Sequence, residues 1–549
     1  MAKKVFYDDD ARQRVLGGAQ ALYDAVKVTM GPKGRNVVIS KSYGHPTVTH
    51  DGVTVAESVE LPDTDDETLG YKVGAELIKQ AATKMNKAAG DGTTTVTVLT
   101  YNILKEANRL IAAGHNPMEL RKGVEAAAAE VLSALEGMAE DIGSKKGRVV
   151  EVATISAGDK EIGELIADVM KKVGGESVIT VEEGQGLKME AEVVEGFTFD
   201  RGFVSTYMVT DTNRMEAVYE KPAIIVTDKK VASVQEFLPI LEKLAQSGKK
   251  DVVLIAEDVE GEALGILVLN KLKGTFNTVA VKAPAFGDRR KEILQDIAIL
   301  TGATLISEDQ GYSFENVDLH AIGSARKVIV GKDSTTIISG AGSAAEVETR
   351  ISEIKAQAEN AKSEYDKEQF EKRAAALGGK VAVIKVGGAS EAEIEEKKFR
   401  VDDAVAATKA ALAEGIVPGG GVTLLALAKG IKVNGSDSIA AGRSILKEAL
   451  RQPFRQIVAN AGLNAEALLA QAEAAKVGMG VNVNTPEKGI IDVKAAGVVD
   501  PVRVTRQAIS SAASIAATAM TMGALVVEIP EKEAPAAPMG GGMPGMGMM

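Results

Sequence analysis

Glycine and threonine residues surround a single carboxylate just ahead of a predicted helix. Residues 90–95 read GDGTTT, and the apolar residues that follow are spaced by three and four: Val96, Leu99, Ile103, Ala107 and Leu110. This spacing predicts an amphipathic helix. A helix N-terminus presents unpaired backbone N–H groups, and glycine lets a ligand approach the backbone closely. The chemistry indicated is phosphate binding, with Asp91 able to hold a Mg²⁺ ion.

Simpler explanations of these glycine-rich segments stay open. Asp91 or Thr93 could cap the N-terminus of an ordinary helix. The pattern G-x-x-x-x-G-K-[ST] is absent and no lysine follows the glycines, which disfavours P-loop nucleotidases and kinases. A second segment, residues 419–421 (GGG), also opens an apolar helix, and it equally suits a turn between two helices.

Composition excludes several kinds of site. The 549 residues include no cysteine, which rules out disulfides, thiol catalysis and cysteine-bound metals. Four histidines lie far apart without the spacing of a zinc site. The 64 Lys and Arg residues against 76 Asp and Glu give a net charge of −12, which argues against nucleic acid as the main partner. Neither a signal peptide nor a membrane-spanning run is visible, so a cytoplasmic protein is expected.

Long amphipathic helices are predicted around the first glycine-rich loop. Hydrophobic periodicity places helices over residues 11–29, 67–88, 93–113 and 117–138. A strand is predicted at 37–39. Residues 48–55 predict a strand pair that turns at Asp51-Gly52.

The middle of the chain has a different pattern of predicted elements. Strands predicted at 223–226, 252–255 and 278–281 alternate with helices, which indicates α/β layering with a parallel core. A charged helical stretch at 342–376, a strand at 381–386 and helices over 391–475 follow. The simplest architecture is a helical domain made from both chain ends, with the middle inserted. The Pro-, Ala-, Gly- and Met-only tail, 535–549, is expected to be disordered.

Taken together, these segments resemble the bacterial group I chaperonins, the GroEL family. The resemblance covers nearly the whole chain and rests on residues 25–38 (AVKVTMGPKGRNVV), 90–95, 199–202 (FDRG), 256–264 (AEDVEGEAL), 285–290 (AFGDRR) and the Gly-Gly-Met tail. It implies a multidomain α+β fold with a helical equatorial domain (1–137 and 414–526), a small α/β intermediate domain (138–195 and 381–413), an α/β apical domain (196–380) and a disordered tail (527–549).

The resemblance also implies an ATP-hydrolysing site that uses ATP, Mg²⁺ and K⁺. Asp91 would bind Mg²⁺, and Asp403 would position the attacking water with help from Asp51. Without the resemblance, a solvated acid beside Lys397, Lys398 and Arg400 of one helix would be the preferred explanation of Asp403. The implied nucleotide-binding residues are Thr29, Met30, Gly31, Pro32, His50, Asp91, Gly92, Thr93, Thr94, Thr95, Gly420, Asn482, Val483 and Asp500.

Three positions depart from the family pattern. His50 stands where lysine is usual, so turnover could depend on pH between about 5 and 8. Asn484 replaces an alanine near the base. Asn464 replaces an acid near the contact between rings, although Arg455 is present. Glycines at 196, 378–379 and 415 are expected to be hinges.

Two apolar stripes in the middle of the chain are candidate client sites. Leu264, Leu267, Val268 and Leu272 lie on one predicted helix face, and a weaker stripe is formed by Leu238, Leu241 and Leu244. Packing against a sheet explains them equally well. The resemblance implies that these residues, with Phe203 and Tyr207, bind unfolded proteins and a GroES-type co-chaperonin.

The resemblance therefore predicts an ATP-driven folding machine, a homo-oligomer of two stacked seven-membered rings, with neither nucleic acid nor membrane as a partner. A passive holdase, which binds unfolded chains without productive ATP cycling, is the alternative. A metabolic phosphotransferase would need an acceptor site for a small molecule, and the sequence shows no such constellation.

Overall fold

A computed structural model of the chain describes residues 3–40, 46–62, 67–143, 145–174, 177–184, 186–212, 214–361, 363–435 and 437–529. They divide into two compact units: unit 1 comes from residues 1–167 and 389–549, and unit 2 from residues 168–388. Unit 1 contains residues from both ends of the chain, as the predicted helical domain does. The finer division into three domains stays a prediction.

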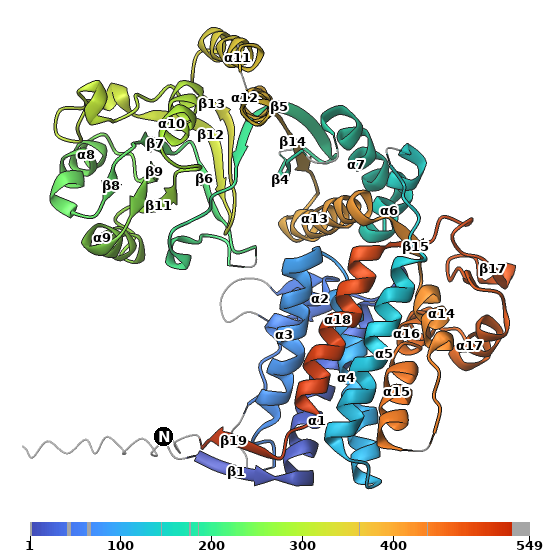
Figure 1. The fold of residues 1–549 in the computed structure, drawn as a ribbon. Coiled ribbons are helices and arrows are strands. Elements are labelled where there is room, and N and C mark those ends of the chain that lie inside the picture. Colours follow the sequence, from blue (N-terminus) through green and yellow to red (C-terminus); the bar gives the residue numbers. More distant parts are fainter. Residues whose placement is uncertain are drawn as a thin grey trace, which may run out of the picture. The chain divides into compact units, whose positions relative to one another are not determined.

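Unit 1 is built mainly of helices. They are α1 (Asp8–Val26), α2 (Gly52–Ser58), α3 (Tyr71–Ala89), α4 (Thr93–Ala112), α5 (Pro117–Glu136), α6 (Lys146–Ala157), α7 (Lys160–Val173, at the boundary of the units), α13 (Glu391–Glu414), α14 (Val422–Gly430), α15 (Ser438–Ala449), α16 (Gln452–Asn460), α17 (Ala465–Ala474) and α18 (Val502–Ala519). The long helices α3, α4, α5 and α18 run alongside one another, as Figure 1 shows. Small and branched side chains such as Ala82, Val96 and Ala512 are completely buried between them. The predicted helices around the first glycine-rich loop are confirmed.

Short strand pairs tie distant parts of unit 1 together. The pairs are β1 (Lys3–Tyr7) with β19 (Ala524–Glu528), β2 (Val37–Ile39) with β3 (Thr47–Thr49), β15 (Ile416–Pro418) with β18 (Val499–Pro501), and β16 (Met479–Val481) with β17 (Ile490–Asp492). The prediction of disorder is wrong for Val527 and Glu528, because both residues pair with β1. Residues 530–549 of that predicted tail lie outside the described residues.

The strand pair predicted at 48–55 is wrong. β3 ends at Thr49, and the apolar residues after Gly52 belong to α2. The Asp51 carboxylate accepts hydrogen bonds from the backbone N–H groups of Val53 (3.2 Å) and Thr54 (2.9 Å). This N-cap starts a helix where alternation of Val and Thr favoured a strand. The Asp-Gly pair is thus a helix start rather than a hairpin turn.

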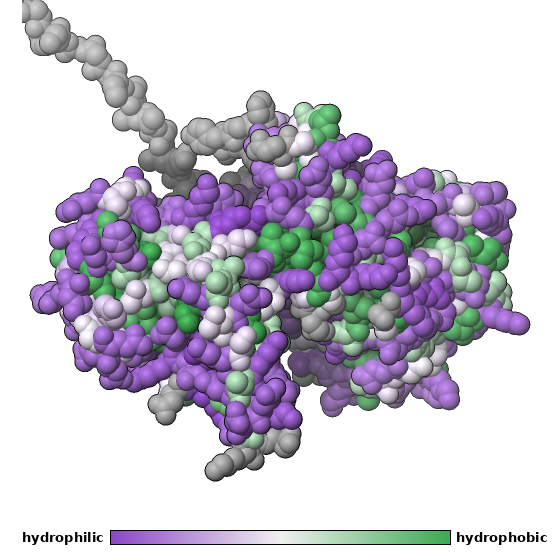
Figure 2. Space-filling model, turned by 90° about the horizontal axis from the view of Figure 1, so that it is seen from above, coloured by the Kyte–Doolittle hydropathy of each residue, from purple (hydrophilic) through white to green (hydrophobic). Residues whose placement is uncertain are grey.

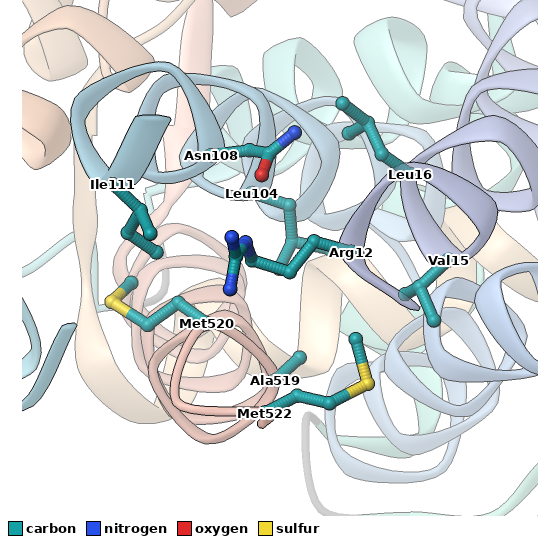
Figure 3. Close-up of a pocket in the computed structure, with 9 residues that line it drawn as sticks. All are labelled: Arg12, Val15, Leu16, Leu104, Asn108, Ile111, Ala519, Met520 and Met522. Atoms are coloured by element: carbon teal, nitrogen blue, oxygen red, sulfur yellow. The ribbon is translucent and has the colours of Figure 1, made fainter. Parts of the chain in front are cut away.

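A small cavity lies where α1, α4 and α18 meet (Figure 3). Its volume is about 20 Å³, and it is lined mostly by apolar side chains such as Leu104 and Met520. Among the described residues, neither Arg12 Nε nor Asn108 Oδ1 has a hydrogen-bond partner, and both atoms are buried. Figure 3 shows the two side chains pointing into the same space. A single water could bridge this donor and this acceptor.

Unit 2 is a mixed sheet covered by helices. Its strands are β4 (Ile179–Glu183), β5 (Glu190–Phe199), β6 (Ala217–Glu220), β7 (Ala223–Val226), β9 (Asp251–Ala256), β11 (Asn277–Lys282), β12 (Gly323–Val330), β13 (Thr335–Gly340) and β14 (Lys380–Val386), with β8 (Lys230–Val231) and β10 (Asp258–Val259) as a separate pair. Its helices are η2 (Thr206–Met208), α8 (Val234–Gln246), α9 (Gly261–Leu272), α10 (Asp288–Thr301), η3 (Glu308–Gln310), η4 (Leu319–Ala321), α11 (Ala344–Glu359) and α12 (Glu364–Leu377).

The sheet of unit 2 has a parallel part and an antiparallel part. Its strand order is β11-β9-β7-β12-β13-β5-β14-β4, with β6 on β12. Strands β7, β9 and β11 are parallel to one another, as the sequence predicted. Side chains of α8, α9 and α10 share one core with these strands, including Phe237, Leu267 and Ile297. The charged stretch 342–376 is two helices rather than one.

Charged side chains, one of them completely buried, connect α10, α11 and α12. Asp296 of α10 is completely buried and accepts from Arg350 of α11 (Nε, 2.8 Å) and from Arg373 of α12. Because the paired charges are taken out of water together, loss of one partner would leave the others uncompensated.

The predicted hinge glycines at 196 and 379 have a packing reason as well. Gly196 lies inside β5, and its N–H donates to the Gly379 carbonyl (3.1 Å). A Cβ on Gly196 would lie 2.2 Å from Val381 Cγ2, so no larger residue fits there. Movement at these positions stays a prediction. Among the described residues, no helix has the length and hydropathy required to cross a membrane.

Candidate functional site

The first glycine-rich loop connects α3 to α4 in unit 1. Gly90 and Gly92 adopt positive φ angles of 69° and 85°, which glycine tolerates best. Gly92 is the N-cap residue of α4, and no side chain caps this end. The simple explanation that Asp91 or Thr93 caps α4 is therefore wrong. The first turn of α4, Thr93 to Thr95, keeps its N–H groups for a ligand.

The second glycine-rich segment has the same design. Gly421 is the N-cap residue of α14, with φ of 77° and no side-chain cap. Next to it, the backbone N–H of Gly420 donates to the carboxylate of Asp500 on β18. Strand β15 pairs with β18, and Val417 lies opposite Asp500. Because the second glycine-rich segment directly follows β15, this pairing brings Asp500 close to it. The segment is therefore a helix start beside an acid rather than only a turn between helices.

Carboxylates from distant parts of the sequence interact across this region. Burial raises the pKa of Asp91, and the charge of Asp51 raises it further. Burial also raises the pKa of Asp500 to about 7, and the nearby charge of Asp91 is the second cause. Asp91 accepts hydrogen bonds from Gly92 N–H and from Ser156 Oγ (2.9 Å). The structure thus places both Asp51 and Asp500 within electrostatic range of Asp91, and the roles that the resemblance implies for them stay predictions.

Threonine hydroxyls line the start of α4. Thr29 Oγ1 lies 3.0 Å from Thr94 Oγ1, which connects the end of η1 (Lys27–Thr29) to the loop. A Cβ on Gly52 would lie 2.3 Å from Thr94 Oγ1, so α2 also approaches this place closely. Met30, Gly31 and Pro32 follow η1 in a turn, and Asn460 Nδ2 donates to the Met30 carbonyl (2.9 Å). The turn is therefore joined to α16 through Asn460, and the residue before it, Thr29, is joined to α4 through Thr94.

His50 precedes the Asp51 cap and faces α13. Burial lowers the pKa of His50, and the charge of Arg400 acts in the same direction. The carboxylates of Glu396 and Asp51 and a hydrogen bond with the Arg35 backbone oppose this shift. Glu396 and Arg400 form an ion pair on α13 (3.0 Å). The imidazole is thus favoured in its neutral form where the family pattern has a fixed positive charge.

Helix α13 brings Asp403 to the loop. A Cβ on Gly90 would lie 2.3 Å from the Cβ of Ala406, so α13 touches the loop there. Asp403 precedes Ala406 by three residues and therefore lies on the same face of α13. Asp403 is neither buried nor fully exposed, so its role in the site stays a prediction. Its side chain is on the helix face that approaches the first glycine-rich loop.

Asn482 and Val483 lie in a turn after β16. Asn482 Oδ1 accepts from the Asn484 N–H (3.0 Å), and its carbonyl accepts from the Thr485 N–H (2.9 Å). Val483 is buried in one cluster with Val422 of α14. The two residues therefore belong to the structure around the second glycine-rich segment.

Oxygen atoms dominate the donor set of the site. Asp91, Asp51 and Asp500 are carboxylates, and oxygen ligands are those that Mg²⁺ prefers. Among the described residues, no group of three or more His, Cys, Asp or Glu forms a ready metal site. An ion held by Asp91 would need phosphate oxygens and water to complete its shell. The residues present fit a magnesium–phosphate group better than a free metal ion.

The predicted client-binding residues are divided between surface and core. Leu241 and Leu267 are buried in the core of unit 2, which is a correction, because these side chains pack on the sheet. Phe203, Leu264 and Val268 are partly buried against the same core. The exposed members are Tyr207 at 67% and Leu238 at 43%.

Two more leucines belong to the apolar surface of unit 2: Leu272, which the sequence predicted on the first stripe, and Leu269, which it did not. Leu269 and Leu272 of α9 are exposed, with Leu272 at 67%. Helix α9 contacts both α8 and η2, which carry Leu238 and Tyr207. Figure 2 shows that hydrophobic residues interrupt an otherwise hydrophilic surface on the face it draws. Leu269 was missed because burial, not helical spacing, decides which leucine faces water.

Ser156 and Asn460 were also missed. Each supports the site through one hydrogen-bonded side chain, and neither belongs to a motif. Asn464, which replaces an acid in the family pattern, is the N-cap of α17 and accepts from the Ala467 N–H (3.1 Å). Nearby, Arg455 pairs with Glu466 (2.9 Å).

One comparison with known proteins bears on this geometry. The family model described as the TCP-1/cpn60 chaperonin family matches residues 22–530. The match includes both glycine-rich segments, α13 and all of unit 2.

Proposed function

The chain belongs to the TCP-1/cpn60 chaperonin family, and on that premise we propose that it is an ATP-driven folding machine of the bacterial group I type. Members of this family assist protein folding, bind unfolded proteins and form ring oligomers, and they are generally ATPases. The predicted α+β chaperonin fold is thereby confirmed. The group I assignment, ATP dependence and encapsulation are our proposals.

One observation carries the proposal: acids from both chain ends gather beside two helix starts that no side chain caps. Uncapped N–H groups of α4 suit phosphate oxygens, and Asp91 lies directly before them. We assign Thr29 to Pro32 and Asp91 to Thr95 to the phosphates, Gly420 and Asp500 to the ribose, and Asn482 and Val483 to the base. K⁺ would bind near the His50 carbonyl.

The chain's own residues would divide the chemistry among them. When bound, Mg²⁺ supplies positive charge that offsets the charge of the phosphates. Asp403 would accept a hydrogen bond from the attacking water, orient it and take its proton. Asp51, fixed by the N–H groups of Val53 and Thr54, would hold a second negative charge close to this water. Because Asp403 is on α13, hydrolysis would require this helix to be docked.

Client binding would use the exposed apolar side chains of unit 2. Tyr207, Leu238, Leu269 and Leu272 would bury apolar surface of an unfolded chain without selecting a sequence. Phe203, Leu264 and Val268 would contribute their exposed parts. A GroES-type co-chaperonin would compete for this surface, and two stacked seven-membered rings would enclose the client.

Steady-state ATP hydrolysis with Mg²⁺ and K⁺ tests the catalytic part. Asp403→Ala should lower the turnover number by about 100-fold or more, because a positioned base contributes about that much. Nucleotide affinity should stay within about threefold, since Asp403 acts on water and not on ATP. Asp402→Ala, a neighbouring acid on α13, is the matched control and should retain most of the activity.

Two results would contradict the proposal. Undiminished turnover in Asp403→Ala would remove this residue from the mechanism. Negligible turnover in the unmutated protein would instead support a passive holdase.

A further inference from the structure

A lysine joins three elements at the edge of the apolar surface of unit 2. Lys271, in the last turn of α9, donates from Nζ to the Met208 carbonyl of η2 and to Tyr219 Oη of β6 (3.0 Å). The same Nζ lies 5.4 Å from the centroid of the Tyr219 ring, within the range of a cation–π contact. One side chain thus connects α9 to both η2 and β6.

The segment that Lys271 contacts presents an exposed aromatic residue. Met208 is completely buried, whereas Tyr207 beside it is 67% exposed. Met208 Sδ accepts from the Ala280 N–H of β11 (3.2 Å), which anchors the side chain of Met208. Lys271 anchors its carbonyl. The orientation of Tyr207 therefore depends on a residue that is held from two sides.

Lys271 also neighbours the exposed leucines of α9. Leu272 follows it directly and is 67% exposed, and Leu269 is two residues earlier. The tether therefore sets the distance between an aromatic side chain on η2 and leucines on α9. Without it, Tyr207 and Leu272 would lie on elements joined only by packing contacts.

The surroundings of the amine are those of an enclosed group. Burial lowers the pKa of Lys271 to about 8, and Asp251 of β9 opposes this shift. An amine taken out of water needs partners, and here a carbonyl and a phenol oxygen supply them. The amine of Lys271 therefore makes these hydrogen bonds rather than being surrounded by solvent.

We propose that Lys271 is a positioning residue that holds η2 against α9 and so sets the geometry of the surface that binds unfolded proteins. The inference rests on the proposed function for its consequence, but the tether itself is a property of unit 2. In water, a lysine side chain would adopt many rotamers. Here the Lys271 amine is hydrogen-bonded to η2 and β6, so its role is to restrain η2 rather than to contact clients.

Hydrogen–deuterium exchange on the full-length protein tests the tether directly. Lys271→Met keeps the length of the side chain and loses its donors. The Met208 and Val209 amides, which donate to the carbonyls of Ser205 and Thr206, should exchange at least about tenfold faster in this variant. Lys271→Arg, which keeps cationic donors, should restore slow exchange. Lys273→Met, an exposed lysine at the end of α9, is the matched control.

Affinity for a carboxymethylated protein that stays unfolded tests the consequence. We expect the dissociation constant to rise about fivefold in Lys271→Met and to return in Lys271→Arg. Tyr219→Phe removes one acceptor but retains the Met208 contact, so it should give a smaller change. If Lys271→Met should fail to fold, Tyr219→Phe still tests the tether.

Unchanged amide exchange in Lys271→Met would overturn the inference. Faster exchange with unchanged client affinity would also overturn it, because the tether would then have no effect on binding. Failure of the proposed function has a different signature: Tyr207→Glu and Leu272→Asp would bind the unfolded protein as well as the unmutated chain does.

Discussion

Three carboxylates in one region are costly unless something offsets their charge. Asp500 lies hundreds of residues after Asp51 and Asp91 in the chain, yet the charge of Asp91 acts on Asp500, as that of Asp51 acts on Asp91. A carboxylate whose pKa is raised by burial and by a neighbouring like charge, as for Asp91 and Asp500, is a candidate functional group. In the function that we propose, a cation bound together with the phosphates would offset this charge.

His50 gives a pH-dependent prediction at the same scale. Burial holds its folded-state pKa below the usual value of about 6.5. The unfolded chain therefore takes up the proton more readily than the folded one as the pH falls below about 7. The part of the unfolding free energy that depends on the neutral imidazole is therefore present above about pH 7 and is lost as the pH falls.

The measurement compares urea denaturation of the unmutated protein and His50→Gln at pH 7.5, 6.5 and 5.5. The unmutated protein should lose more unfolding free energy on acidification than His50→Gln, which carries no titrating group at this position. Parallel losses in the two proteins would show that His50 does not titrate differently on folding.

Contacts between elements decide whether Asp403 reaches the site. Gly90, with its positive φ, leaves room for Ala406 of α13, and no side chain fits between them. Gly90→Ala should push α13 away from the loop and add about 1 kcal/mol of backbone strain. A displacement of about 1 Å can lower turnover by about 100-fold. ATP hydrolysis should therefore fall by about that factor while ATP binding persists.

The matched rescue is Ala406→Gly in the same chain. It removes the methyl group that a side chain at position 90 would strike, at a helix cost of about 1 kcal/mol. At least about tenfold of the lost turnover should return. Equal turnover in Gly90→Ala with and without Ala406→Gly would mean that strain in the loop, not helix contact, causes the loss.

Sequence patterns predicted the elements better than their surroundings. Periodicity placed α3, α4 and α5 to within a few residues at most ends, because a helix buries one regularly spaced face. The same reasoning failed after Thr49, where the Asp51 cap overrode strand-like alternation. It also failed to separate buried Leu267 from exposed Leu269, since both positions are apolar and only tertiary packing distinguishes them.

The candidate site shows the same limit. Its glycine-rich loops were visible because a ligand approaching the backbone demands a recognisable composition. Ser156 and Asn460 were not, because one hydrogen bond from a side chain leaves no pattern in the sequence. The resemblance to chaperonins supplied the roles of Asp403 and Asp500, which composition and spacing do not reveal.

At the scale of the whole molecule, the proposed nucleotide site depends on residues from both chain ends. Asp91 and Asp500 lie in unit 1, which also holds α13, whereas the apolar surface around Tyr207 belongs to unit 2. A chaperonin that works by hydrolysis must couple these two parts. A passive holdase needs only a unit 2 that can bind unfolded chains.

Refolding of a chemically denatured client enzyme tests this coupling most directly. The assay measures recovered client activity with the unmutated protein and a GroES-type co-chaperonin, with ATP and without it. We predict recovery that requires ATP and is lost in Asp403→Ala, although that variant still binds the unfolded client. Client binding without any gain in recovered activity on addition of ATP would contradict the account and identify a passive holdase.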